Sequence, residues 1–303
     1  MSKQINLYWY KHIIGNGNFG DELNHFIISK LSGSKINRII IPSSGINYIY
    51  RCLSLIYHKM VPIKDLSILI QQFFINDFVV AIGSVISTIN SRQCKVWGSG
   101  IINKNDHIRP ALFYAVRGKY TQQRLRELNL PVPYVIGDPA ILLPIVYPVQ
   151  RNIKYKLGII PNHIQYSDLK KMISSEKIIL INLTDPIEKV ISEINSCEYT
   201  ISSSLHGIIV SHAYKIPSLW YNFSIAKRKL YGDDIKFYDY FSSVGIEEYQ
   251  PHIIKTDVIN LNEIINTFKY NNNYSLVQLD LKELQKKLLD SAPFKILESF
   301  KIN

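Results

Sequence analysis

The chain has 303 residues, of which 47% are hydrophobic and 19% charged, and its formal net charge is +11. This composition excludes an intrinsically disordered protein, and the length predicts two domains around two cores. The positive charge indicates anionic partners, which include nucleic acid, an anionic membrane face, and phosphate or carboxylate substrates.

The cysteines and the N-terminal sequence indicate the cellular compartment in which the protein is expected. Cys52, Cys94 and Cys197 are far apart and do not have metal-ligand spacing with histidine, so we expect reduced thiols and neither disulfides nor a zinc site. The N-terminus lacks the apolar segment of a signal peptide, and polar residues interrupt the apolar stretch 66–86. We therefore expect a cytoplasmic protein, and the sequence leaves open a contact with the inner face of the membrane.

Short β-rich segments alternate with helical patterns along the first half, which favours parallel sheets built from βαβ units. The apolar residues of 21–31 share one helical face, and 121–130 is predicted to be a helix capped by Thr121. The predicted strands of this half are 5–10, 38–42, 77–83, 95–100, 112–118 and 133–139.

The basic, proline-containing segment 143–156 predicts a joint between domains. A second series follows, with strands predicted at 156–163, 177–185, 198–203 and 216–223 and helices at 166–174, 186–196 and 205–215. We expect an α/β protein in which an N-terminal domain (1–148) and a C-terminal domain (149–273) face a central cleft. A final helix within 274–303, with leucines at spacings of three and four, is expected to pack back on the N-terminal domain.

The turn after the first predicted strand carries three glycines, at 15, 17 and 20, just before Asp21. Such glycines let the backbone approach a ligand, and free amides at a helix start favour an anion or sugar hydroxyls. The turn is no dinucleotide fingerprint, because Asp21 would repel a pyrophosphate. The alternative is a plain turn in which Asp21 caps the helix.

Arg117 and Asp138 each follow a predicted strand of the first half. An arginine that leaves a buried strand needs a partner, so Arg117 either pairs with a carboxylate such as Asp138 or binds a phosphate or carboxylate ligand. Asp138 precedes Pro139 and is expected to hold the turn or a helix start.

Two strands of the second half end in a histidine, His163 and His206. If these strands are parallel members of one sheet, both side chains lie at the same edge, where ligands bind in such folds. His206 also lies in the first turn of a helix, next to the hydroxyls of 202–204. The alternative for either residue is a buried core histidine, and we expect that role for His212.

A basic run, 227–229, follows the next strand. Arg228 and Lys229 are expected to lie on a solvated face. Lys227 is expected nearest the cleft and is a candidate for neutralising a phosphate.

Taken together, these motifs resemble the polysaccharide pyruvyl transferase family, in particular the branch that adds pyruvate ketals to bacterial exopolysaccharides. The matching segments run in the family's order over residues 5–245. They are GNFGDELN (17–24), GSG (98–100), VRGKYTQ (116–122), GDPAILLP (137–144), IIPNH (159–163), SSSLHGIIVSHAYKIPSLWY (202–221) and KFYDYFSSVG (236–245).

The resemblance implies a GT-B-like fold of two Rossmann-type domains. It implies phosphoenolpyruvate as donor, a polysaccharide or a lipid-linked glycan as acceptor, a cyclic pyruvate ketal as product, and no cofactor, metal or nucleic-acid partner. Much of the family has arginine where this chain has Ser204, and proline is common at the position of Lys119.

The residues, read together with the resemblance, give an expected site. The catalytic residues would be His206 and His163. The donor would contact Arg117, Lys227, Ser203, Ser204, Leu205 and Gly207, and the acceptor would contact Asn18, Gly20 and Asp21.

Two alternatives remain at this point. A nucleotide-sugar-dependent GT-B glycosyltransferase would need a carboxylate that holds a ribose in the second domain. Glu198 precedes the last strand there instead of following it, so it is poorly placed for this role. A catalytically weak glycan-binding relative is suggested by Ser204. Nucleic-acid binding is disfavoured, because the basic residues are scattered and do not alternate with aromatic side chains in a stripe.

Overall fold

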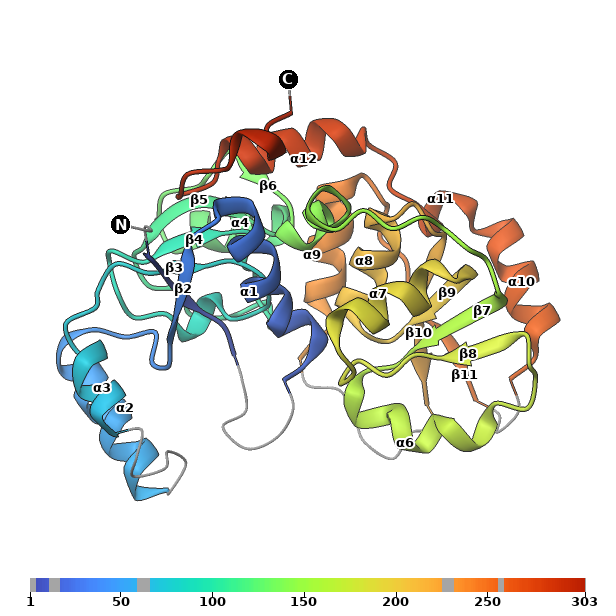
Figure 1. Cartoon of the computed structure of the whole chain (residues 1–303), viewed down its shortest axis with the longest axis horizontal. Helices are drawn as coiled ribbons and strands as arrows, with labels where there is room; N and C mark the ends of the chain where they lie inside the picture. The colour runs from blue at the N-terminus through green and yellow to red at the C-terminus, as the bar shows by residue number, and fades with distance from the viewer. Residues whose placement is uncertain (1–3, 11–16, 59–65, 225–231, 256–258, 303) are drawn as a thin grey trace.

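The computed structural model of the chain describes residues 4–10, 17–58, 66–224, 232–255 and 259–302. Two parallel β-sheets, of six and five strands, lie side by side with helices packed around them (Figure 1). The predicted α/β class with parallel sheets is therefore confirmed.

The first sheet has the strand order β2-β1-β3-β4-β5-β6, and all its pairings are parallel. Its strands are β1 (Gln4–Tyr8), β2 (Lys35–Ile39), β3 (Val79–Val80), β4 (Lys95–Trp97), β5 (Leu112–Val116) and β6 (Val135–Ile136). Each of the six strands predicted in the first half is present. The chain leaves β1 to one side for β2 and then crosses to the other side for β3, so the order reverses between β1 and β3.

The second sheet repeats this pattern with the order β11-β10-β9-β7-β8. Its strands are β7 (Tyr155–Ile160), β8 (Ile178–Leu180), β9 (Cys197–Ser202), β10 (Ser218–Phe223) and β11 (His252–Ile254). Here the order reverses between β7 and β9, which pair in parallel with Ile160 opposite Ser202. In open parallel sheets, the crevice at such a reversal is the usual ligand site.

Helix α1 (Phe19–Ser32) lies at the junction of the two sheets (Figure 1). It buries Leu23, Ile27 and Leu31 on one face and ends at Gly33, whose φ of 62° requires the left-handed conformation that glycine adopts easily. At its start, the Phe19 amide donates to the Leu183 carbonyl (2.9 Å), beyond β8. The first turn of α1 is thereby attached to the second sheet.

Most other helices cover the sheets or connect their strands. They are α2 (Gly45–Tyr57), α3 (Leu66–Gln72), α4 (Lys119–Glu127), α5 (Leu143–Val146), α6 (Tyr166–Leu169), α7 (Ile187–Asn195), α8 (Leu205–Ala213), α10 (Leu261–Tyr270), α11 (Asn272–Ser275) and α12 (Leu281–Asp290). None of the helices in the described ranges is both long and apolar enough to span a bilayer.

Helix α12 brings the C-terminal part of the chain back onto the first sheet (Figure 1). The indole nitrogen of Trp97 donates to the Leu288 carbonyl (3.0 Å), and the Gln285 amide donates to the Ile141 carbonyl (2.8 Å). Leu288 is fully buried. These contacts tie the end of the chain to the half in which it begins.

Helix α9 (Ile235–Val244) packs against both sheets, and the sequence patterns did not predict it. On one side, the Phe237 ring stacks on Trp220 of β10, with centroids 4.2 Å apart and planes at 14°. On the other side, Asp239 accepts a hydrogen bond from Arg117 Nε (3.0 Å), and both side chains are fully buried. Helix α9 therefore links the second sheet to the end of β5.

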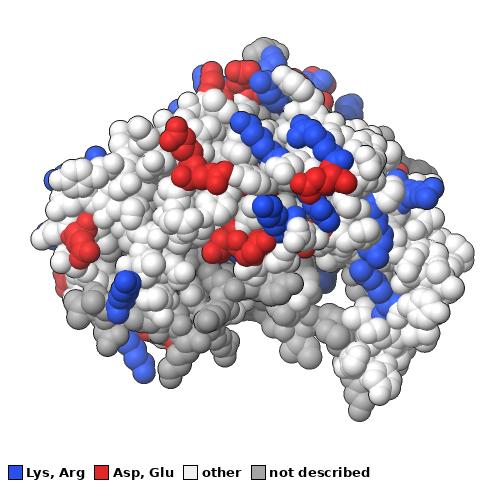
Figure 2. All heavy atoms as spheres, turned by 180° about the vertical axis from the view of Figure 1, so that it is seen from behind, with Lys and Arg blue, Asp and Glu red and all other residues white. Residues whose placement is uncertain are grey.

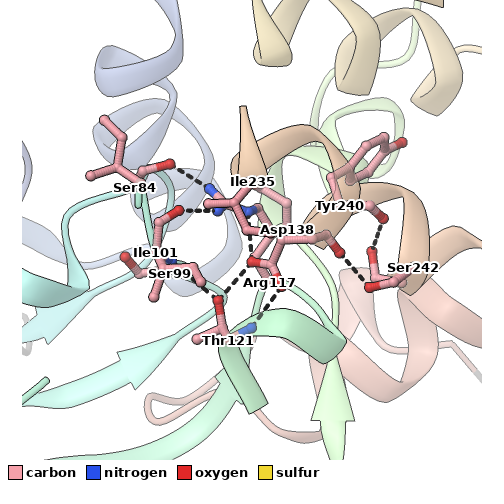
Figure 3. Close-up of polar contacts among 12 residues, drawn as sticks. Ser84, Ser99, Ile101, Arg117, Thr121, Asp138, Ile235, Tyr240 and Ser242 are labelled. Atoms are coloured by element: carbon pink, nitrogen blue, oxygen red, sulfur yellow. Dashed lines mark hydrogen bonds and ion pairs between the residues drawn. The ribbon is translucent and has the colours of Figure 1, made fainter. Parts of the chain in front are cut away.

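The ion pair belongs to a saturated polar network (Figure 3). Thr121 donates to Asp239 through its amide (2.9 Å) and its hydroxyl (2.6 Å). Arg117 also donates to the Ser84 hydroxyl and to the Ile101 carbonyl, each at 2.5 Å. Although Arg117 and Thr121 favour the ionised carboxylate, burial raises the pKa of Asp239 overall.

This network corrects two predictions. The partner of Arg117 is Asp239 rather than Asp138, because pairing across the junction depends on tertiary packing and not on sequence spacing. Thr121 is no helix cap: the N-cap of α4 is Gly118, and Thr121 lies inside the helix with its hydroxyl directed to Asp239.

Asp239→Ala leaves Arg117 buried without its counter-charge, so we expect it to lower the free energy of unfolding by about 3–5 kcal/mol. Urea unfolding of wild type and variant measures this. The double variant Arg117→Met/Asp239→Leu removes both charges and should lose clearly less than the single variant. A single-variant loss below about 1 kcal/mol would show that the pair does not hold α9 in place.

Candidate functional site

His206 lies in the first turn of α8, directly after the N-cap residue Ser204 and Leu205. Its side chain is 13% exposed, and its Nε2 atom lies 3.7 Å from Asp138 Oδ2. Both atoms are buried, and neither has a hydrogen-bond partner among the residues that the structure describes. The imidazole of His206 therefore faces the Asp138 carboxylate directly.

Asp138 has two functions, of which the sequence suggested one. Its Oδ1 accepts a hydrogen bond from the Ala140 amide (3.0 Å) and caps the turn Pro139–Leu142, as expected. Its Oδ2 faces His206, which the sequence analysis missed. The sequence did contain one signal for this contact, since both residues directly follow predicted strands of parallel sheets.

The first turn of α1 passes directly against the imidazole. A Cβ added to Gly20 would overlap the ring atoms of His206. Only glycine permits this approach, so Gly20, one of the three glycines expected to let the backbone approach a ligand, brings the backbone of α1 against His206. The strand-order reversals of the two sheets meet at this contact, because α1 follows β1 and His206 follows β9.

Asp21 follows Gly20 in the first turn of α1. A Cβ added to Gly83, beyond β3, would lie 3.6 Å from Asp21 Oδ1. Burial raises the pKa of Asp21 to about 6, while the charge of His206 and a 3.4 Å hydrogen bond from Asn18 lower it. Asp21 therefore titrates near neutrality beside an imidazole. The alternative role as a helix cap is not observed, since Asn18 is the N-cap residue.

His163 lies at the same edge of the second sheet, at the start of the short turn His163–Gln165 that follows β7. Ser203 positions this turn: its hydroxyl accepts from the Asn162 amide (2.9 Å) and donates to Gln165 Oε1 (2.7 Å). The register of β7 and β9 places the two histidine-bearing turns next to each other.

Several residues expected to contact the donor have internal roles instead. The Ser203 hydroxyl is fully buried and occupied as described. Leu205 packs in the core, and a Cβ added to Gly207 would collide with Ser202 and Ile160, so this glycine lets α8 approach the sheet. Of this set, Ser204 remains at the helix start without a side-chain capping bond.

The charged residues expected to hold the donor are also placed differently. Arg117 is fully buried and donates to three protein acceptors. Its side chain therefore stabilises the residues around the site and does not extend into it. Lys227 lies outside the described residues. His212, expected to be structural, is buried with its Nδ1 atom 3.0 Å from the Tyr240 hydroxyl, and burial lowers its pKa to about 4.

Lys236, in the first turn of α9, is a cation that the sequence analysis did not select. Burial and then the charge of Arg117 lower its pKa. Its Nζ lies 5.3 Å from the Phe237 ring centroid, and no carboxylate in the described ranges lies within 4.0 Å of it. The available signal was its position at the start of the motif KFYDYFSSVG.

The arrangement combines an imidazole, two carboxyl groups and a partly buried cation near the reversals of both sheets. Such a site can transfer protons and attract an anion. Within the described parts of the chain, no group of three or more His, Cys, Asp or Glu side chains is arranged to hold a metal ion.

Comparisons with known proteins give a family and one relative. A family model described as polysaccharide pyruvyl transferase matches residues 5–224. The chain is 29% identical over 313 residues to the uncharacterized protein L143 of Acanthamoeba polyphaga mimivirus, and the alignment covers 98% of this chain and 96% of that protein. No solved structure matched the chain.

Asp21→Asn should change stability in a pH-dependent way. The carboxyl has a pKa of about 6 in the folded protein against 3.8 without its surroundings, so its ionisation opposes folding. The protein is therefore most stable, with respect to this carboxyl, below pH 3.8, and it loses that stability as the pH rises through about 6. We therefore expect the variant to be more stable than wild type by roughly 2–3 kcal/mol at about pH 8, and by much less near pH 4.

Chemical unfolding at both pH values tests this expectation. Asp290→Asn, at the exposed end of α12, is the matched control and should show no such pH dependence. Equal effects of Asp21→Asn at both pH values would contradict a raised pKa.

Proposed function

Since the chain belongs to the polysaccharide pyruvyl transferase family, we propose that it moves pyruvate from phosphoenolpyruvate to a sugar, forming a cyclic ketal and releasing inorganic phosphate. Pyruvyl transfer to polysaccharide follows from the family. The donor, the ketal linkage and the acceptor, a surface polysaccharide or its lipid-linked precursor made in the cytoplasm, are part of the proposal. We further propose that the two sheets face a GT-B-like cleft, with the donor on the side of the second sheet.

The donor carries a phosphate and a carboxylate. Lys236 is the described cation best suited to one of them, because it is partly buried and, among the described residues, no carboxylate lies within 4.0 Å of its Nζ atom. The free amides at the start of α8, beyond Ser204, suit the other group. Lys227 remains a further candidate. Arg117 supports this side by fixing Ser84 and by adding positive potential next to Lys236.

The histidines are proposed to transfer the protons. A protonated imidazole delivers its proton to C3 of the enol ester, and positive character develops at C2. One sugar hydroxyl bonds to C2 and loses its proton to a base, and a second hydroxyl then displaces the phosphate. Overall, the two sugar hydroxyls lose two protons. One of them is matched by the hydrogen added to C3, which becomes a methyl group, and the other leaves with the phosphate. His206 is assigned the acid role in this proposal, because it is the histidine that lies between Asp138 and the start of α1.

Asp21 and Asn18 are proposed to receive the acceptor sugar. A carboxyl group with a pKa of about 6 is partly ionised near neutrality, so it can accept a proton from an attacking hydroxyl and release it again. Asn18 hydrogen-bonds this carboxylate and fixes its orientation.

One observation carries the proposal: His206 lies between Asp138 and the start of α1, where both strand-order reversals meet. The glycosyltransferase alternative is weakened by Glu198, near the start of β9, which pairs with Lys156 (2.6 Å) and does not lie at the carboxyl edge of the sheet.

His206→Ala should slow phosphate release from phosphoenolpyruvate by roughly 10²–10⁴-fold, the usual effect of losing a general acid or base. The assay measures phosphate with a glycan acceptor present and confirms the pyruvate ketal by mass spectrometry. His25→Ala, at an exposed position of α1, is the control and should be fully active. Wild-type turnover by the His206 variant would remove this residue from the mechanism. Glycan binding without phosphate release by wild type would support a non-catalytic relative instead.

Lys236→Met should raise the KM for phosphoenolpyruvate by roughly 10- to 100-fold, as expected for one lost charge-assisted contact, with a smaller change in kcat. Because burial lowers the pKa of Lys236, donor binding by wild type should also weaken at a lower pH than it would with an exposed lysine. Lys282→Met, at an exposed position of α12, is the matched control. An unchanged KM in Lys236→Met would place the donor elsewhere.

A further inference from the structure

Helices α2 and α3 form a lobe that extends from the body beside the first sheet (Figure 1). The lobe has a small core of its own, in which Tyr48 and Leu69 pack with Ile41. The Tyr48 hydroxyl donates to the Leu69 carbonyl (2.7 Å). The inner face of α2 therefore packs within the lobe.

The outer face of α2 is apolar and exposed. Its side chains recur at spacings of three and four and cover about a third of the helix circumference. They are Ile46, Ile49, Tyr50, Leu53, Ile56 and Tyr57. Leu53 is 58% exposed and Tyr57 81%; in the same lobe, Ile70 and Phe74 are also exposed, at 70% and 79%. An apolar stripe of this kind along one exposed helix face indicates a contact surface.

The base of the lobe is basic. Arg92 and Arg109 line a cavity of about 460 Å³ with Asn47 and Asn90, and no carboxylate lines it. Burial lowers the pKa of Arg51 on α2, and the charge of Arg109 contributes in the same direction. None of these three arginines has a carboxylate within 4.0 Å among the described residues.

The charged residues of this region are mostly basic. Residues 33–76 include five Lys or Arg and one acidic residue. In Figure 2 the lobe is largely white, with basic side chains at its base and no acidic side chain in view. An apolar surface beside uncompensated arginines matches an anionic lipid bilayer, in which acyl chains lie below a layer of phosphates.

We propose that α2 and α3 dock the protein on an anionic lipid bilayer. The outer face of α2 enters the boundary between headgroups and acyl chains, where Tyr50 and Tyr57 suit the polar–apolar transition. Arg92 and Arg109 contact lipid phosphates. A second copy of the chain fits less well, because a twofold contact brings the same patch of both copies together and would bring the arginines of both near one another. The proposal does not depend on pyruvyl transfer.

Flotation with vesicles tests the proposal on the full chain. We expect binding to vesicles of mixed phosphatidylcholine and phosphatidylglycerol, and much weaker binding to phosphatidylcholine alone or at high salt. Ile49→Ser/Leu53→Ser should reduce binding to the mixed vesicles by about tenfold or more. Arg92→Gln/Arg109→Gln should reduce the preference for the anionic lipid without abolishing the apolar contribution.

The controls are matched in exposure and chemistry. Ile253→Ser/Leu279→Ser changes two half-exposed apolar residues outside the lobe, and Arg126→Gln changes an exposed arginine of α4; neither should alter binding. Absence of wild-type binding to the mixed vesicles would overturn the proposal. So would equal losses in the control variants, or a dimer in light scattering that Ile49→Ser/Leu53→Ser dissociates while wild type ignores vesicles.

Discussion

The buried ion pair between Arg117 and Asp239 is the constraint on which the rest of the molecule depends. Two charges without access to water are tolerated only when they are fully paired and hydrogen-bonded, and Thr121, Ser84 and Ile101 complete that requirement. The pair fixes α9 against the first sheet, while the stacking of Phe237 on Trp220 fixes it against the second. The contact of His206 with Asp138 and α1 lies across the same junction, so the site geometry depends on this attachment.

Burial acts on both signs of charge within the site. It raises the pKa of Asp21 and lowers that of Lys236, so burial shifts both groups towards their uncharged forms. An anion next to Lys236 would favour its protonated form, and protonation of Asp21 would reduce its repulsion of the same anion. Donor binding and proton uptake are therefore expected to be coupled through the local dielectric environment, without any large structural change.

The sequence patterns were sufficient for the sheets and insufficient for the junction. Buried parallel strands are continuous apolar runs, so each strand of the first sheet could be located before the structure was known. Helix α9 was missed although its residues do have an amphipathic period, because the segment 236–245 was used only as a motif of the resemblance. Pairing of Arg117 with a carboxylate was one of two alternatives, but spacing does not identify Asp239, which lies 122 residues away in the sequence. The structure places His206 and Asp21, both selected from their positions after predicted strands, close enough to interact. The burial of Ser203 depends on packing and could not be predicted.

Helix α9 also bears on how reactants reach the site. In two-domain proteins that close by rotation about a linker, the halves separate along a surface that is easily solvated. Here such a rotation would expose a carboxylate–guanidinium pair and an aromatic stack at once, which would make the opened state costly. The angle between the halves is therefore expected to be nearly constant through turnover. Selectivity would then come from the fixed geometry and charge of the residues around His206 and not from a closing movement.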